Sequence, residues 1–177
     1  KDKYVAAMKD VTYGDPMDRG SDMGPLSTFD LRDRVHNQVQ DTVKKGAECL
    51  CGGEMPDGEG AFYPATVLAN IPQGTPAYED EIFGPVASLF KVKDAQAAID
   101  LANDHRYGLG GGIFSQDTEK AIDIACNQLD TGMVNVNGYG AARPNMPFGG
   151  VKESGYGREH GGFGLKEFMN IKSVCVL

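Results

Sequence analysis

The stretch Glu81-Ile82-Phe83-Gly84-Pro85-Val86 places a carboxylate, an aromatic ring and a Gly-Pro turn directly before an apolar run that continues to residue 92. Such a run predicts a β-strand, and Asp94 is then positioned to cap a helix that follows it. A carboxylate accepts hydrogen bonds from hydroxyl groups, while an aromatic ring offers a flat apolar surface. The stretch therefore indicates a ligand-binding turn at the beginning of a strand–helix unit.

Helices and strands alternate on both sides of this stretch. Apolar residues spaced four apart from Leu31 to Val43 predict a helix that ends near Gly46, with Ser27 as its N-cap. The other helices are expected over residues 1–11, 95–102, 118–129 and 161–168. The strands are expected over residues 47–51, 62–68 (an edge or bulged strand, because of Pro64), 86–92, 110–115 and 133–136. This order predicts an α/β fold with a largely parallel sheet flanked by helices, in a single domain.

Charge and cysteine usage narrow the class of protein. The net charge of −8 argues against a nucleic-acid partner, and no apolar run approaches the ~20 residues of a membrane span. The first residues lack the character of a signal peptide, and we expect a reducing, cytoplasmic setting. The cysteines have the spacing of no common zinc site, so no metal is expected: Cys49, Cys51, Cys126 and Cys175. We expect Cys49 and Cys51 to be small buried residues that share one face of a strand.

Two glycine patterns near the C-terminal end fall short of phosphate-binding loops. Residues 150–156 begin like a P-loop, but Tyr156 stands where that motif requires lysine. Residues 155–160 begin like a dinucleotide-binding fingerprint, but His160 replaces its last glycine and no apolar strand precedes it. None of the histidines has the spacing of a triad or a metal site, so we expect surface or structural roles for all three: His36, His105 and His160.

Two motifs nevertheless match one known family. Residues 81–85 match the Glu-x-Phe-Gly-Pro motif of NAD(P)-dependent aldehyde dehydrogenases, and Pro147-Phe148-Gly149-Gly150 begins a second family segment that continues to Glu159. Other family landmarks follow in family order: Gly14-Asp15-Pro16, Met23-Gly24-Pro25-Leu26, Gly52-Gly53, Tyr63-Pro64-Ala65-Thr66, Ala102-Asn103-Asp104, Tyr107-Gly108-Leu109 and Val136-Asn137. The chain therefore resembles the C-terminal half of an aldehyde dehydrogenase along essentially its whole length.

The resemblance implies roles for several residues. In the family, the glutamate of the first motif holds the hydroxyls of the nicotinamide ribose and the phenylalanine packs beside it. This implies that Glu81 and Phe83 bind the cofactor, which is NAD or NADP. It also implies that Asn137 ends a strand near the substrate pocket and that Phe148 lines the aldehyde entrance.

Within the family, the chain looks most like a bacterial succinate-semialdehyde dehydrogenase, through residues 29–33, 67–70 and 170–173. The distal carboxylate of a semialdehyde acid needs a cationic or hydrogen-bonding partner. Arg143, in the segment that corresponds to the substrate-anchoring loop (residues 138–146), could supply it. Ala142 stands where some of these enzymes have a serine, and a solvent-facing role is the alternative for Arg143.

The resemblance also indicates what these residues lack. The nucleophilic cysteine of the family lies in a Gly-Gln-x-Cys context, which none of the four cysteines here has. We expect the nucleophile, the base glutamate and the dinucleotide-binding region upstream, and hence no dehydrogenase activity for the 177 residues alone. Residues 1–168 are expected to be the C-terminal part of the catalytic domain. Residues 169–177 are expected to be an oligomerisation strand of a homodimer or homotetramer.

Two alternatives stay open at this point. The terminal segment could instead be a strand of the chain's own sheet. The chain could also be a non-catalytic assembly module that keeps the family fold. A reading frame that supplies Gly-Gln-x-Cys upstream would favour the enzyme, whereas a true start near Lys1 would favour the module.

Overall fold

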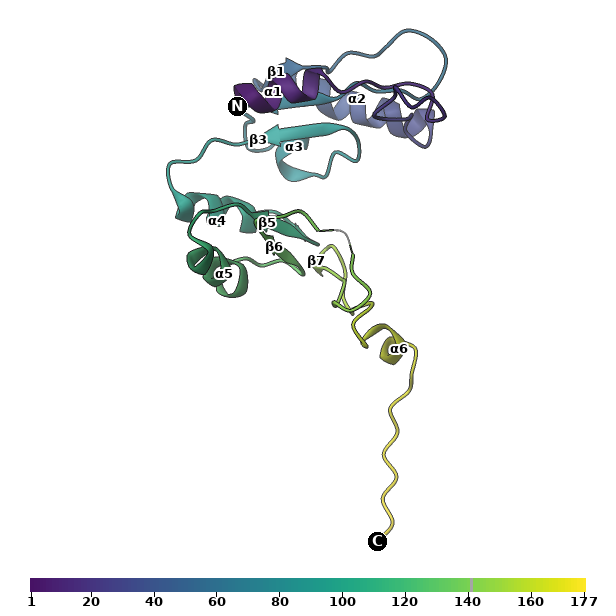
Figure 1. Cartoon of the computed structure of the whole chain (residues 1–177), viewed down its shortest axis with the longest axis vertical. Helices are drawn as coiled ribbons and strands as arrows, with labels where there is room; N and C mark the ends of the chain where they lie inside the picture. The colour runs from purple at the N-terminus through teal and green to yellow at the C-terminus, as the bar shows by residue number, and fades with distance from the viewer. Residues whose placement is uncertain (141) are drawn as a thin grey trace. The chain divides into compact units, whose positions relative to one another are not determined.

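The computed structural model describes residues 1–140 and 142–177, which form two compact units, Lys1–Lys91 and Val92–Leu177. Each unit contains helices and strands of its own (Figure 1). The boundary between the two units falls in a short exposed connection, residues 90–94, between a strand and a helix. The sequence shows no long linker, and the assignment of residues 1–168 to one catalytic domain stays a prediction.

The first unit contains a three-stranded sheet in the order β1-β2-β3, made by Glu48–Cys51, Thr66–Ala69 and Val86–Leu89. Strand β1 is antiparallel to β2, and β2 is parallel to β3, with helix α3 (Pro76–Glu79) in the crossover. All four residues of β2 are buried, as expected for the central strand of a covered sheet. The strand predicted over residues 62–68 begins only at Thr66, because Pro64 has no N–H to donate to a ladder.

Helix α2 (Phe29–Lys44) supplies a large part of the core of this unit, while the shorter helix α1 (Asp2–Lys9) contacts β1 and β2. The predicted apolar stripe is confirmed, since its two central valines are fully buried in a cluster with residues of β2 and α3: Val35, Val39, Ala47, Tyr63, Leu68, Ile71 and Ala77. The predicted N-cap, Ser27, is wrong. Thr28 caps the helix, because its Oγ1 accepts a hydrogen bond from Leu31 N at 3.1 Å.

The second unit contains one strand–helix–strand crossover and one short antiparallel pair. Strand β5 (Gly111–Ile113) is parallel to β6 (Val134–Val136), and helix α5 (Thr118–Asn127) connects them, as the sequence predicts. Strand β4 (Tyr107–Gly108) is antiparallel to β7 (Val151–Lys152), a pair that is too short to leave a periodic pattern. Helix α4 (Ala95–Asn103) opens the unit, and helix α6 (Gly164–Glu167) lies near its end.

Helices α4 and α5 of the second unit begin at aspartate caps. Asp94 Oδ1 accepts from Ala97 N at 2.8 Å, which confirms the predicted cap of α4, and Asp117 Oδ1 accepts from Lys120 N at 3.0 Å at the start of α5. The α/β class is therefore confirmed. Both parallel pairs enclose a helical crossover, while β1–β2 and β4–β7 are antiparallel.

Residues 169–177 are exposed and have no strand assignment in the single chain. A strand is defined by its partner, so a segment that pairs only with a second copy would have this appearance. The oligomerisation strand thus stays a prediction. Within residues 1–140 and 142–177, none of the helices combines the length and the apolar character that a membrane span requires.

Candidate cofactor and substrate sites

The turn at residues 81–85 displays its two predicted ligand-binding side chains on the surface. Glu81 is exposed and Phe83 is 63% exposed, whereas Ile82 between them packs against the core. The turn is tied to the sheet by the hydrogen bond from Thr66 N to Pro85 O at 2.8 Å. A carboxylate and an aromatic ring thus project outward from a turn that the central strand holds in place.

The turn packs closely against helix α2 at Gly84. A Cβ at this position would lie 2.9 Å from Val35 Cγ2 and 3.0 Å from Val35 Cγ1. Because Val35 is fully buried in helix α2, it has no space into which to move. A glycine is therefore needed for the turn to rest on the core, and this contact sets the position of Phe83 relative to α2.

A cavity of about 480 Å³ lies beside Phe83, at the N-terminal end of α2. Its other lining residues come from the helix and the residues before it: Ser27, Thr28, Asp30, Leu31 and Arg34. Sequence reasoning did not identify Arg34 or Asp30 as site residues. The available signal was their spacing, since residues four apart share one helix face, here the face toward the turn of Phe83.

The residues at this turn fit a nicotinamide nucleotide. The exposed Glu81 carboxylate has the acceptor oxygens that a ribose diol requires, and the exposed ring of Phe83 offers a surface for a planar group. Arg34 adds a cation to the same lining as Phe83. This is the chemistry that the resemblance implies for the first motif.

In the second unit, Asn137 follows β6 directly, as expected of a residue that ends a strand. It has φ +54°, a conformation that asparagine tolerates better than most residues, and its N–H donates to Ile113 O at 2.8 Å. Its Oδ1 accepts from Ser115 N at 2.8 Å. Since the amide oxygen is engaged, the amide NH₂ is the group that Asn137 would offer to a substrate.

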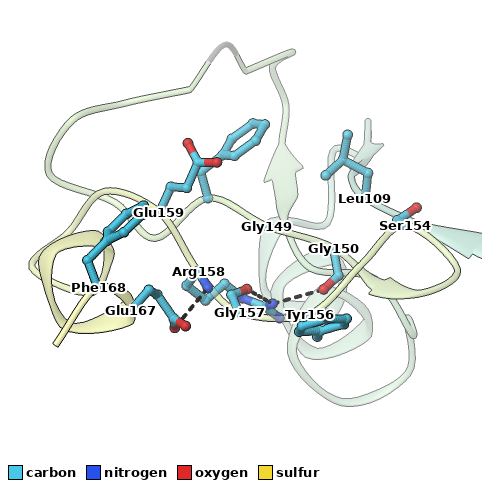
Figure 2. A pocket seen from close by; sticks show the side chains of 12 residues that line it. Leu109, Gly149, Gly150, Ser154, Tyr156, Gly157, Arg158, Glu159, Glu167 and Phe168 are labelled. Carbon is cyan, nitrogen blue, oxygen red and sulfur yellow. Dashed lines mark hydrogen bonds between the residues drawn. The ribbon is translucent and has the colours of Figure 1, made fainter. Parts of the chain in front are cut away.

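Phe148 lies in the segment after the predicted anchoring loop and is half-buried. Its N–H donates to Glu159 O at 2.9 Å, and Glu159 N donates to Phe148 O at 2.7 Å. Phe148 lines a cavity of about 320 Å³, whose other walls include Tyr156, Arg158 and Glu167 (Figure 2). The labelled residues come from the 149–159 segment, from α6 and the residue that follows it, Phe168, and from Leu109.

Arg143 is exposed, and its carbonyl accepts from Met146 N at 3.0 Å within a turn. Neither Arg143 nor Asn137 is among the described residues that line the cavity beside Phe148. Residue 141, which belongs to the predicted anchoring loop of residues 138–146, lies outside the described residues. The structure thus brings Glu81 and Phe83 together in one turn, and places Asn137, Arg143 and Phe148 at three separate points of the second unit.

The glycines of the 147–161 segment allow close approach of backbones. A Cβ on Gly132 would overlap Gly149 O, and a Cβ on Gly161 would lie 2.9 Å from Pro147 N. A Cβ on Gly149 would lie 2.7 Å from Gly157 O. These glycines therefore serve packing between the segments.

The cysteines differ from expectation. Cys49 is exposed and Cys51 half-buried, and a β-bulge between them breaks the two-residue alternation that would put both on one face. The Cys49 thiol donates to the carbonyls of Cys51 and Gly52, both at 3.4 Å. Although the residue as a whole is exposed, partial burial of its sulfur raises the pKa of Cys49. A raised pKa lowers the thiolate fraction, so Cys49 does not have the environment of an activated nucleophile. Among the described residues, no group of three or more potential ligands could hold a metal ion.

The sequence profile of the Aldehyde dehydrogenase family matches residues 1–174, and the chain belongs to this family. It is 45% identical over 171 residues to an aldehyde dehydrogenase of Paenarthrobacter nicotinovorans, with 97% of this chain and 37% of the relative covered. It is 46% identical over 173 residues to the NAD(P)+ succinate semialdehyde dehydrogenase Sad of Escherichia coli (strain K12), with 98% of this chain and 37% of the relative covered.

A solved structure supports the same relationship. The crystal structure of succinic semialdehyde dehydrogenase from Streptococcus pyogenes, in complex with NADP+ as the cofactor, matches with a TM-score of 0.90 and 39% identity. The match covers 96% of this chain and 38% of that one. The chain thus spans a little over a third of the length of the relatives it matches, and the recognition of the family from its motifs is confirmed.

Proposed function

We propose that the protein oxidises an aldehyde to the carboxylic acid with NAD or NADP, and that the aldehyde is succinate semialdehyde. In this proposal the chain contributes Glu81 and Phe83 to the cofactor site and Asn137, Arg143 and Phe148 to the aldehyde site. The observation that carries the proposal is the 81–85 turn. It exposes a carboxylate and a ring together, on a tightly packed glycine, in a chain of the Aldehyde dehydrogenase family.

NAD(P), when bound, supplies the hydride acceptor of the reaction. The part of Glu81 is to accept hydrogen bonds from the two ribose hydroxyls, which fixes the orientation of the sugar. Phe83 limits movement of the same part of the cofactor by contact with its ring. Arg34, which lines the cavity beside Phe83, contributes positive charge near an anionic ligand.

The cofactor role of Glu81 is tested by Glu81→Gln in the whole protein. We expect the KM for NAD(P) to rise about tenfold, since a charge-assisted acceptor of ~1.4 kcal/mol is weakened, while the KM for the aldehyde changes little. Glu79→Gln is the matched control, because Glu79 belongs to the same acidic run and accepts from Gly74 N within its own turn. Equal KM values for NAD(P) in wild type and Glu81→Gln would contradict the role.

The substrate is tested by comparing succinate semialdehyde with butanal, which has the same chain length and no distal carboxylate. If Arg143 holds that carboxylate, Arg143→Gln raises the KM for the semialdehyde by about 10- to 100-fold, the effect of losing a hydrogen bond between charged groups. The KM for butanal should be unchanged. No effect on either aldehyde would identify Arg143 as a solvent-facing loop residue, and an equal effect on both would show that Arg143 does not hold the carboxylate.

The same assay separates the enzyme from the non-catalytic assembly module. The module predicts oligomers without turnover of any aldehyde in the panel, whereas the enzyme predicts NAD(P)H formation that depends on the aldehyde. The assay is made on the whole protein, because none of the four cysteines described above lies in the Gly-Gln-x-Cys context of the family nucleophile.

The four free cysteines are in keeping with a reducing, cytoplasmic setting.

Assembly is proposed to use residues 169–177, paired as a strand with a second copy in a homodimer or homotetramer. The support is the row of exposed apolar side chains in this segment, which includes Ile171, Val174 and Val176. Val174→Pro removes a backbone donor and should lower the molar mass measured by light scattering after size-exclusion chromatography. Val174→Thr, which keeps the donor and the β-branch, should preserve it, and equal masses for all three proteins would contradict the proposal.

A further inference from the structure

The side chain of Arg158 contacts two parts of the glycine-rich loop formed by residues 147–161. Its Nη1 donates to Gly150 O at 2.8 Å and to Gly157 O at 2.6 Å (Figure 2). Its backbone N–H donates to Glu167 Oε1 at 3.3 Å, so the same residue also contacts helix α6. Hydrogen bonds from a guanidinium are charge-assisted and directional, which suits them to hold a backbone in one conformation.

The loop is built to admit this side chain. A Cβ on Gly149 would lie 3.0 Å from Arg158 Cδ and 3.3 Å from its Nη1. The arginine therefore crosses the backbone at a residue without a side chain and reaches the carbonyl beyond it. Gly149 thus serves both the approach of the two backbones and the passage of the arginine stem.

The contacts of Arg158 lead directly to Phe148. Arg158 holds the carbonyl of Gly150, two residues after Phe148, and is itself followed by Glu159, whose backbone exchanges two hydrogen bonds with Phe148. The buried hydrophobic residues described in the second unit, Ile99 and Ala121, both lie outside this loop. Polar contacts position the Phe148 backbone, and Arg158 makes two charge-assisted ones beside it, to Gly150 O and Gly157 O.

We propose that Arg158 is a positioning residue for the aldehyde entrance, which acts by fixing the loop that carries Phe148. The inference rests on the proposed function, because it uses the role of Phe148 in that proposal. A residue that shapes the entrance affects the substrate equally in the ground state and the transition state. Its loss therefore raises KM and leaves kcat nearly unchanged.

The test is a double-mutant cycle in the whole protein with Arg158→Ala and Phe148→Ala. Each single variant should raise the KM for the aldehyde about tenfold, with kcat within about threefold of wild type and the KM for NAD(P) unchanged. If Arg158 acts through Phe148, adding Arg158→Ala to Phe148→Ala should change the KM by less than about twofold. Effects that multiply would overturn the proposal, as would an unchanged KM in Arg158→Ala.

Two further variants separate positioning from general damage to the fold. Arg158→Lys keeps the charge, so its KM for the aldehyde should rise less than that of Arg158→Ala. Millimolar guanidinium should lower the KM of Arg158→Ala for the aldehyde and leave the KM of wild type unchanged. If neither the lysine variant nor guanidinium lowers the KM, the substitution has damaged the fold and the proposal is contradicted. Arg19→Lys, at an exposed arginine of the first unit, is the control for an arginine substitution as such.

Hydrogen exchange separates failure of this inference from failure of the proposed function. In Arg158→Ala, the amides of Phe148 and Glu159 should exchange faster, because their reciprocal hydrogen bonds lose support. Unchanged exchange contradicts the loop contact, whatever the activity. Absence of aldehyde turnover by the wild-type protein contradicts the proposed function and, with it, the aldehyde role assigned to Phe148.

Discussion

The two units of this chain are each stabilised by different interactions. Of the 13 buried hydrophobic residues described, 11 lie in Lys1–Lys91 and two in Val92–Leu177. The first unit is therefore stabilised by side-chain burial, with Tyr63 and Leu68 at its centre. The second buries fewer such side chains, and its 147–161 segment is held by hydrogen bonds and by glycines that let backbones approach. The comparison teaches that the same substitution should have different costs in the two units, for different physical reasons.

The largest effect is expected for Leu68→Ala, which opens a cavity at a fully buried position of β2. We expect a loss of about 2–5 kcal/mol in the free energy of unfolding. Leu165→Ala in α6 makes the same chemical change at a side chain that is 75% exposed, and should cost less than about 0.5 kcal/mol. Urea titration measures both. Similar losses for the two leucines would break the comparison between the units.

The next effect is expected for Gly132→Ala, whose Cβ would overlap Gly149 O. Because backbone must move, we expect a loss of about 1–3 kcal/mol, confined to the second unit. Gly138→Ala is the control, since a Cβ there would meet nothing within 4 Å. Thermal melting gives the size of the change, and hydrogen exchange by mass spectrometry gives its location. Loss of protection within β2 in place of the 147–161 segment would be against the expectation.

Alkaline pH should weaken the first unit through Tyr63. Burial, and secondarily the charge of nearby Cys49, raises the pKa of Tyr63 in the folded protein. Its contribution is thus complete below the unfolded-state pKa of about 10 and is lost as the pH rises above it, with a slope of at most about 1.4 kcal/mol per pH unit. Tyr63→Phe should remove this slope. If Tyr63→Phe still loses stability between pH 9 and 11 in melting curves, the loss belongs to another group, such as Cys49, whose pKa burial also raises.

The smallest effect is expected at the helix caps, which both units use in the same way. Thr28→Ala and Asp94→Ala each remove an acceptor of the first free N–H groups, and each should cost about 1 kcal/mol. Ser27→Ala should cost less than either, because the hydroxyl that caps α2 belongs to Thr28. A larger loss for Ser27→Ala than for Thr28→Ala in a denaturant titration would reverse this assignment.

Local patterns were the part of the fold most open to prediction. The stripe from Leu31 to Val43 located α2, and Asp94 located the start of α4, because helix periodicity and capping involve residues within one turn of each other. Periodicity does not locate the inward face of α4, where Ile99 is buried but the apolar residues Ala95, Ala98 and Ala102 are exposed. Alanines carry too little apolar surface to decide which face of a helix is covered.

For the candidate site, the Glu-x-Phe-Gly-Pro motif identified Glu81 and Phe83, and the family comparison agrees with the family that it indicated. Arg34 and the part played by Arg158 were not predictable, because each depends on contact with residues distant in the chain or on the path of a loop. Arg34 and Phe83 line one cavity although they lie about fifty residues apart in the chain. Arg158 reaches Gly150 only because Gly149 leaves the path open.

The amino-acid sequence by itself determined the family, the α/β class and the longer helices α1, α2, α4 and α5, because these depend on short motifs and on periodicities that each segment carries alone. Tertiary structure alone decided the division into two units, the β4–β7 pair and which glycines bring backbones together. These features arise from contacts between segments far apart in the chain, where the free energy depends on the space between atoms and cannot be read from residue order.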